Sequence, residues 1–119
     1  MKVAITAQKQ DLSSPVDLRF GRAQCIIVVD TETGEHQVVD NAVNLNIAQG
    51  AGIQTAKNVV DLGADAVITG NVGPKAFGVL SHARINVFLT RDQTVSEAVT
   101  ALKDGTLEQV SQANVEGHW

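Results

Sequence analysis

Short apolar runs separated by turn-forming residues divide the chain into alternating strands and helices. Buried strands are predicted where apolar residues follow one another without a helical period, at Lys2–Ala7, Cys25–Asp30, Ala64–Thr69 and Ile85–Leu89. The Cys25–Asp30 run is apolar at consecutive positions, so it is expected to be covered on both faces. Thr31–Gly34 has the composition of a turn, which predicts that Glu35–Asp40 returns as the second strand of a hairpin.

Two helices are predicted in the middle of the chain. Ile53, Ala56 and Val60 recur at helical spacing, and this helix is expected to stop at Gly63. Pro74 suits the first position of a second helix, which runs to about Ala83.

A third helix is predicted from residues that mark both of its ends. Thr94 and Glu97 have the spacing of a capping box, and Gly105 is placed to end the helix. Its apolar stripe consists of Val95, Ala98, Val99 and Leu102.

A hairpin followed by strand–helix alternation predicts a three-layer α/β/α domain. Its sheet is expected to have five strands, mostly parallel, with one antiparallel strand from the hairpin. Residues 1–105 are predicted to form this single domain. Residues 106–119 show no pattern and are expected to form a mobile C-terminal tail.

Composition and net charge restrict the classes of function that the chain can have. The chain has 119 residues, of which 44% are hydrophobic and 18% charged, as in a single folded globular domain. Nine Lys and Arg against 13 Asp and Glu give a net charge of −4. This charge argues against a general binder of nucleic acid or anionic membranes, so an anion site must be local. No apolar run is long enough for a signal peptide or a membrane span, which predicts a cytoplasmic protein.

Ligands of such sheets bind beyond the carboxyl ends of the parallel strands. Three segments are expected to meet there: Arg19–Arg22, Gly50–Ile53 and Gly70–Pro74. Two helix N-termini with unpaired N–H groups, glycines that allow close approach and two arginines would make an anion pocket. The predicted binding residues are Arg19, Phe20, Gly21, Arg22, Gly50, Ala51, Gly52, Ile53, Asn71, Val72, Gly73 and Pro74.

Simpler interpretations remain open for the same residues. The glycines could serve turn geometry alone, and the arginines could be surface ion-pair partners. Neither glycine segment matches the P-loop or the dinucleotide-binding fingerprint.

Several motifs in these segments are shared with a known family. They are Ser14-Pro15, Arg19-Phe20-Gly21-Arg22-Ala23, Gly50-Ala51-Gly52-Ile53-Gln54, Gly63-Ala64-Asp65-Ala66-Val67-Ile68, Gly70-Asn71-Val72-Gly73-Pro74-Lys75-Ala76-Phe77 and Thr94-Val95-Ser96-Glu97-Ala98. Over almost its whole length the chain resembles the dinitrogenase iron–molybdenum cofactor biosynthesis family. The resemblance implies a ribonuclease-H-like fold and non-enzymatic carriage of a metal–sulfur cluster.

Within that family, a stand-alone single domain implies a molybdenum–copper sulfide cluster whose metals are bound by inorganic sulfides. Such a polyanion would be held by amide donors, by the two arginines and by apolar contacts from Phe20, Ile53 and Val72. Iron–molybdenum cofactor precursor carriage is an alternative, as is a regulatory module that binds a nucleotide, a phosphate or a P-loop ATPase of the partitioning type. A nuclease is disfavoured because Lys2–Ala7 contains no acidic residue.

Some positions depart from the family pattern. Gln49 stands where many members have a histidine, which disfavours the iron–molybdenum cargo. Cys25 replaces a frequent aromatic residue and is expected to be a buried structural thiol, with metal ligation as the alternative. A lone cysteine excludes an internal disulfide and a zinc site of several thiolates. His36, His82 and His118 are expected on the surface, and His118 in the tail is an alternative copper ligand.

Overall fold

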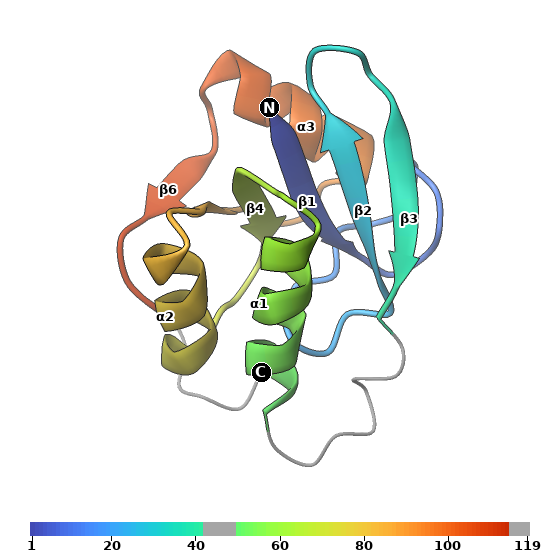
Figure 1. Ribbon diagram of the computed structural model, residues 1–119. Coiled ribbons are helices and arrows are strands. Elements are labelled where there is room, and N and C mark those ends of the chain that lie inside the picture. The colour runs from blue at the N-terminus through green and yellow to red at the C-terminus, as the bar shows by residue number, and fades with distance from the viewer. Residues whose placement is uncertain (42–49, 115–119) are drawn as a thin grey trace.

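The computed structural model describes residues 1–41 and 50–114. Nine helices and strands lie in these two ranges (Figure 1). In chain order they are β1 (Lys2–Ala7), β2 (Cys25–Asp30), β3 (His36–Asp40), α1 (Ala51–Asp61), β4 (Ala66–Thr69), α2 (Pro74–His82), β5 (Asn86–Leu89), α3 (Val95–Asp104) and β6 (Glu108–Val110). The predicted elements are therefore present, with bounds that differ by one or two residues.

The six strands form one sheet in the order β3-β2-β1-β4-β5-β6. β1, β4 and β5 are parallel neighbours, whereas β2 runs antiparallel to both β1 and β3, and β6 runs antiparallel to β5. The predicted α/β class with a mostly parallel sheet is confirmed. The predictions of five strands and of one antiparallel strand are wrong, because β2 and β6 both oppose β1.

The sixth strand lies in the segment that was predicted to be a tail. Glu108 and Gln109 are exposed and Val110 is only half-buried, so β6 has no apolar run to reveal it. It is recognised only by its pairing, which places Val110 opposite Val87 and Glu108 opposite Leu89. The folded structure therefore continues past the predicted domain end at residue 105.

Helices cover both faces of the sheet, which makes three layers (Figure 1). One core cluster joins α1 and α2 to β2, β4 and β5, with Leu80 and Val67 among its fully buried side chains. A second cluster joins α3 to the opposite face, with Val95 and Ile5 fully buried. β2 contributes alternate residues to the two clusters, so it is covered on both faces as predicted.

The buried face of α1 differs from the predicted stripe. Thr55, Ala56 and Val59 are buried, whereas Val60 is 37% exposed. The buried face of α1 is therefore rotated by one residue from the predicted stripe, so that Val59 and not Val60 packs in the core. Among the described residues, no helix is long and apolar enough to cross a membrane.

Candidate functional site

The candidate site lies at the edge of the sheet where the parallel strands β1, β4 and β5 end, called here the carboxyl edge. α2 connects β4 to the parallel strand β5, so it begins at the carboxyl edge and runs back along the sheet. α1 leads into the start of β4 and therefore also begins at the carboxyl edge. The two helices pack side by side (Figure 1), which brings Gly50–Ile53 and Gly70–Pro74 to one edge as predicted.

The N-termini of α1 and α2 differ from that of α3. Both begin after a glycine, and neither has an acidic residue in its first turn. α3 begins with a complete capping box, in which Thr94 accepts from the Glu97 N–H and Glu97 accepts from the Thr94 N–H. The positive ends of α1 and α2 thus lack the side-chain compensation that α3 has, which favours an anion beside them.

The Arg19–Arg22 segment is tied to the turn between β4 and α2. Arg19 forms an isolated parallel bridge with Asn71, and the Phe20 N–H donates to the Asn71 carbonyl at 3.2 Å. The Asn71 side chain donates to the Leu18 carbonyl at 3.1 Å. Two of the three predicted segments are therefore in direct contact.

Two threonine hydroxyls anchor this loop to the sheet, a feature that was not predicted from the sequence. Thr6 on β1 and Thr69 on β4 are buried neighbours, with 2.8 Å between their hydroxyl oxygens. The Thr6 hydroxyl donates to the Asp17 carbonyl at 2.6 Å. The available signal was a threonine at or next to the end of each of two predicted strands, Lys2–Ala7 and Ala64–Thr69.

Glycine occupies two positions at the carboxyl edge for different structural reasons. Gly50 has φ +82°, and no atom of the described residues lies within 4 Å of a hypothetical Cβ, so its backbone conformation alone favours glycine. At Gly70, a Cβ would lie 2.6 to 2.7 Å from three atoms of Leu18, so glycine allows two loops to approach. Turn geometry alone, the simpler interpretation, therefore accounts for Gly50, whereas the close packing of two loops accounts for Gly70.

The cations of the candidate site are not equivalent. Arg19 pairs with the buried carboxylate of Asp17, with 3.4 Å between Nε and Oδ1, so its charge is partly compensated. Arg22 is half-buried in the same loop. Lys75, the second residue of α2, is exposed and has no ion pair within the described residues. A cation there is unfavourable for the helix dipole, but it adds to the attraction for an anion.

Two predicted contact residues belong to the core. Phe20 and Val72 are both 0% exposed and pack in the α1–α2 cluster. The expected apolar contact with a ligand is therefore not available from these side chains, because neighbouring side chains cover them. Ile53 is half-buried and keeps part of its surface accessible.

Asn114 occupies part of the turn between β4 and α2. The Val72 N–H donates to Asn114 Oδ1 at 2.7 Å, and the Asn114 N–H donates to the Val72 carbonyl at 3.2 Å. Asn114 Nδ2 also donates to the Gly70 carbonyl and to Asn71 Oδ1, at 3.2 and 3.1 Å. This residue lies in the predicted tail, and no sequence pattern pointed to it.

Cys25 lies on the other side of the sheet from α1 and α2. It is 1% exposed, belongs to the α3 cluster and donates its thiol hydrogen to the Lys9 carbonyl, with 3.1 Å between the heavy atoms. Burial raises the pKa of the Cys25 thiol above its usual value, and the charges of Asp40 and Asp17 raise it further. These contacts fit the structural interpretation of Cys25.

The remaining candidate ligands do not gather in one place. His36 and His82 are exposed, one on β3 and the other at the end of α2. Gln49 and His118 lie outside the described residues. Within residues 1–41 and 50–114, no three His, Cys, Asp or Glu side chains are grouped so that they could hold a metal ion.

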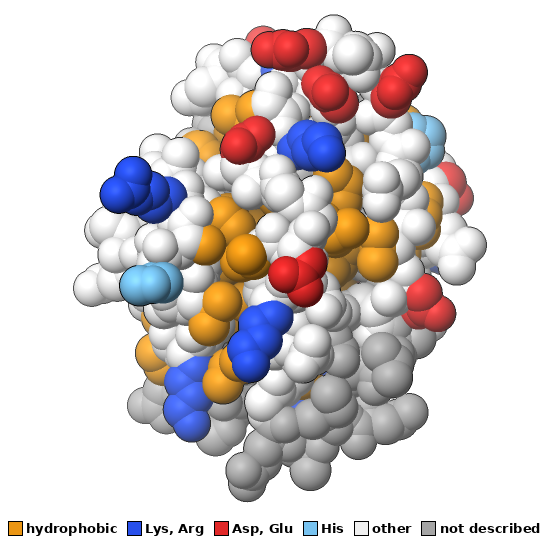
Figure 2. Space-filling model, in the orientation of Figure 1, with side chains coloured by type: hydrophobic (Ala, Val, Ile, Leu, Met, Phe, Trp, Pro, Cys, Tyr) orange, Lys and Arg blue, Asp and Glu red, His pale blue; other side chains and the backbone are white. Residues whose placement is uncertain are grey.

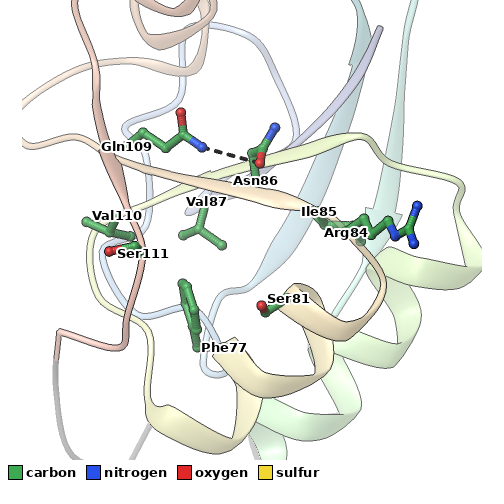
Figure 3. A pocket seen from close by; sticks show the side chains of 9 residues that line it. All are labelled: Phe77, Ser81, Arg84, Ile85, Asn86, Val87, Gln109, Val110 and Ser111. Carbon is green, nitrogen blue, oxygen red and sulfur yellow. Dashed lines mark hydrogen bonds between the residues drawn. The ribbon is translucent and has the colours of Figure 1, made fainter.

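A hollow of about 430 Å³ lies between α2, β5 and β6 (Figure 3). Phe77 and Val87 form its apolar floor, and the Gln109 side chain donates to Asn86 Oδ1 at 3.3 Å on its rim. It is lined by the later part of α2 and by the start of β5, so it is separate from the carboxyl edge.

Comparisons with known proteins agree with this architecture. The family model described as "Dinitrogenase iron-molybdenum cofactor" matches residues 1–105. An uncharacterised protein of Methanocaldococcus jannaschii is 29% identical over 112 residues, covering 92% of this chain and 91% of that protein. The apo form of the orange protein from Desulfovibrio gigas is similar with a TM-score of 0.93 and 38% identity, covering 96% of each chain. A solution structure of a Thermotoga protein assigned to the DUF35 family gives a TM-score of 0.84 and 38% identity over 98% of each chain. The chain therefore belongs to the dinitrogenase iron–molybdenum cofactor family.

Proposed function

We propose that this protein is a non-enzymatic carrier of an anionic metal–sulfur cluster, with a molybdenum–copper sulfide as its cargo. Family membership supports a cofactor-binding or carrier role. The similarity to the orange protein, which has an apo form, supports the same role. The observation that carries the proposal is the pair of uncompensated helix N-termini at one edge of the sheet.

The residues at the carboxyl edge fit a cargo that brings its own metal ligands. The first N–H groups of α1 and α2 have no partner among the described residues, and they can donate to sulfide or oxide ligands. Lys75 and Arg22 add positive charge, and the accessible part of Ile53 offers apolar contact. The Val72 N–H already donates to the carboxamide oxygen of Asn114, so a hydrogen-bond acceptor fits at this turn.

Each group has a role in holding the cargo. The Gly73 and Gly50 ends of the helices present backbone donors, which are fixed in place by the packed helices and need no side-chain ordering. The threonine pair and the Asn71 contacts keep the Arg19–Arg22 loop against the turn. The cluster is released when water or the polar groups of a partner replace these hydrogen bonds and charge interactions.

Reconstitution tests the proposal directly. The purified protein is incubated with tetrathiomolybdate and copper, desalted, and analysed for metals and by absorption spectroscopy. We expect molybdenum and copper to be retained in a fixed ratio, with a visible band that free tetrathiomolybdate lacks. Loss of all metal on desalting would contradict the proposal.

A matched pair of variants locates the cargo. Lys75→Ala removes a charge at the start of α2, and Lys103→Ala removes the same charge from the exposed end of α3, which packs on the opposite face of the sheet. Lys75→Ala should weaken retention and make it less sensitive to added salt, whereas Lys103→Ala should match the unmodified protein. Arg19→Ala combined with Arg22→Ala should also weaken retention. Equal retention by all variants would move the cargo away from the carboxyl edge.

A further inference from the structure

The segment after α3 forms a strap, defined here as residues 108–114, that is attached at two places. Its first part is β6, which pairs with β5 at the far edge of the sheet. Its last residue, Asn114, makes the four hydrogen bonds to Gly70, Asn71 and Val72 described above. Between these attachments, the strap passes the rim of the hollow at Ser111 (Figure 3).

Asn114 is well matched to the turn because a carboxamide both donates and accepts. Its Oδ1 takes the Val72 N–H at 2.7 Å, at the short end of the range for N–H···O bonds. Val72 directly precedes Gly73, the residue that caps α2. The neutral Asn114 Oδ1 therefore accepts from the Val72 N–H, a backbone donor that an anion at this helix end would use.

The same contact is easily displaced. Asn114 is exposed, so water can replace its partners when it leaves. β6 pairs with β5 through Glu108–Val110, so its pairing does not use Asn114. Release of Asn114 would thus uncover the Val72 N–H without unfolding the strand.

We infer that Asn114 is an internal competitor of the cargo, and that cluster binding displaces it from the turn. This inference rests on the proposed function. Asn114 then lowers the affinity of the empty protein for the cluster, and this end of the strap moves when the site fills, while β6 keeps its place in the sheet. Displacement costs the cargo the net free energy of the lost Asn114 contacts, and one such hydrogen bond corresponds to roughly a two- to tenfold change in affinity.

Asn114→Ala tests the competition, with Gln109→Ala as its control. Both variants remove a carboxamide from the strap, but the Gln109 side chain bonds to Asn86 and lies away from the turn. We expect Asn114→Ala to bind the tetrathiomolybdate–copper cluster about two- to tenfold more tightly than the unmodified protein. Gln109→Ala should show unchanged affinity. In the cluster-free protein, hydrogen exchange of the Val72 amide should be faster in Asn114→Ala only.

The metal-binding measurements distinguish failure of the Asn114 competition from failure of the carrier role. Affinity in Asn114→Ala that is equal to or weaker than that of the unmodified protein would overturn the competition and leave the carrier role intact. If neither protein retains metal, the carrier role fails, and the competition fails with it.

Discussion

The Thr6 hydroxyl donates to the main-chain carbonyl of Asp17 at 2.6 Å, which fixes the loop of the candidate site to the first strand of the sheet. The Thr69 hydroxyl also donates to this carbonyl at 3.5 Å, and the Asp17 N–H donates to the Thr6 carbonyl at 2.8 Å. Thr6 and Asp17 are both buried, so removal of the Thr6 hydroxyl would leave the carbonyl with only the longer contact to Thr69. Together these contacts couple the stability of the fold to the position of the Arg19–Arg22 segment.

Thr6→Val tests that coupling, because valine keeps the shape of threonine and removes the hydroxyl. We expect the free energy of unfolding to fall by about 0.5–1.5 kcal/mol, measured by chemical denaturation. Thr100→Val, at an exposed position of α3, is the control and should change stability by much less. Equal effects of the two substitutions would show that the Thr6–Asp17 contact contributes little.

Gly70→Ala should destabilise the protein through a steric conflict with Leu18. The new Cβ would lie 2.6 Å from Leu18 Cδ2 and 2.7 Å from Leu18 Cα, so the loop must move. We expect a loss of about 1–3 kcal/mol in the free energy of unfolding, together with weaker cargo retention.

Gly78→Ala is the matched control for that substitution. Gly78 lies within α2, and a Cβ there meets no atom within 4 Å. Because alanine favours the helix over glycine, we expect a gain of about 0.5–1 kcal/mol. A destabilising Gly78→Ala combined with a neutral Gly70→Ala would contradict the close contact between Leu18 and Gly70.

Cys25 should make the stability of the protein fall at alkaline pH. Burial is the first cause of its raised pKa, so the folded state holds the thiol proton at pH values where the unfolded chain has released it. The stabilisation is complete below the ordinary thiol pKa, and it is lost as the pH rises through the folded value. In denaturation curves from pH 7 to pH 10, the decline should therefore be smaller for Cys25→Ser than for the unmodified protein.

The same variant tests metal ligation by the thiol. We expect the absorption of the reconstituted Cys25→Ser protein to equal that of the unmodified protein, because Cys25 lies on the α3 side of the sheet. An altered spectrum would bring the thiol into the cluster site and contradict its structural role.

Thr94→Ala should remove half of the capping box that starts α3. The Thr94 hydroxyl accepts from the Glu97 N–H at 3.1 Å, and loss of such a cap costs about 0.5–2 kcal/mol. Thr100→Ala, in the exposed middle of the same helix, should be neutral or slightly stabilising. Cargo retention should not change in either variant if the cluster binds beside α1 and α2.

Local patterns along the chain predicted the elements that bury apolar surface or carry their own end signals. Cys25–Asp30 is apolar at consecutive positions because both of its faces are covered, and Thr94, Glu97 and Gly105 mark the two ends of α3. The meeting of the two glycine segments also followed from the sequence, because strand–helix alternation places helix N-termini at one edge of a parallel sheet.

Contacts between distant residues could not be predicted in this way. β6 has no apolar run, and its pairing with β5 depends on backbone hydrogen bonds that any sequence can make. Asn114 and Val72 are 42 residues apart, and the match between a carboxamide and a turn is visible only when the chain has folded. The sequence by itself determined the class of fold and the edge of the sheet at which α1 and α2 begin, because these depend on local periodicity and on connection rules. Only the tertiary structure decided that Phe20 and Val72 are core residues, that Arg19 is paired with Asp17 and that Asn114 occupies the turn, because burial and pairing are set by packing between segments that are remote in the chain.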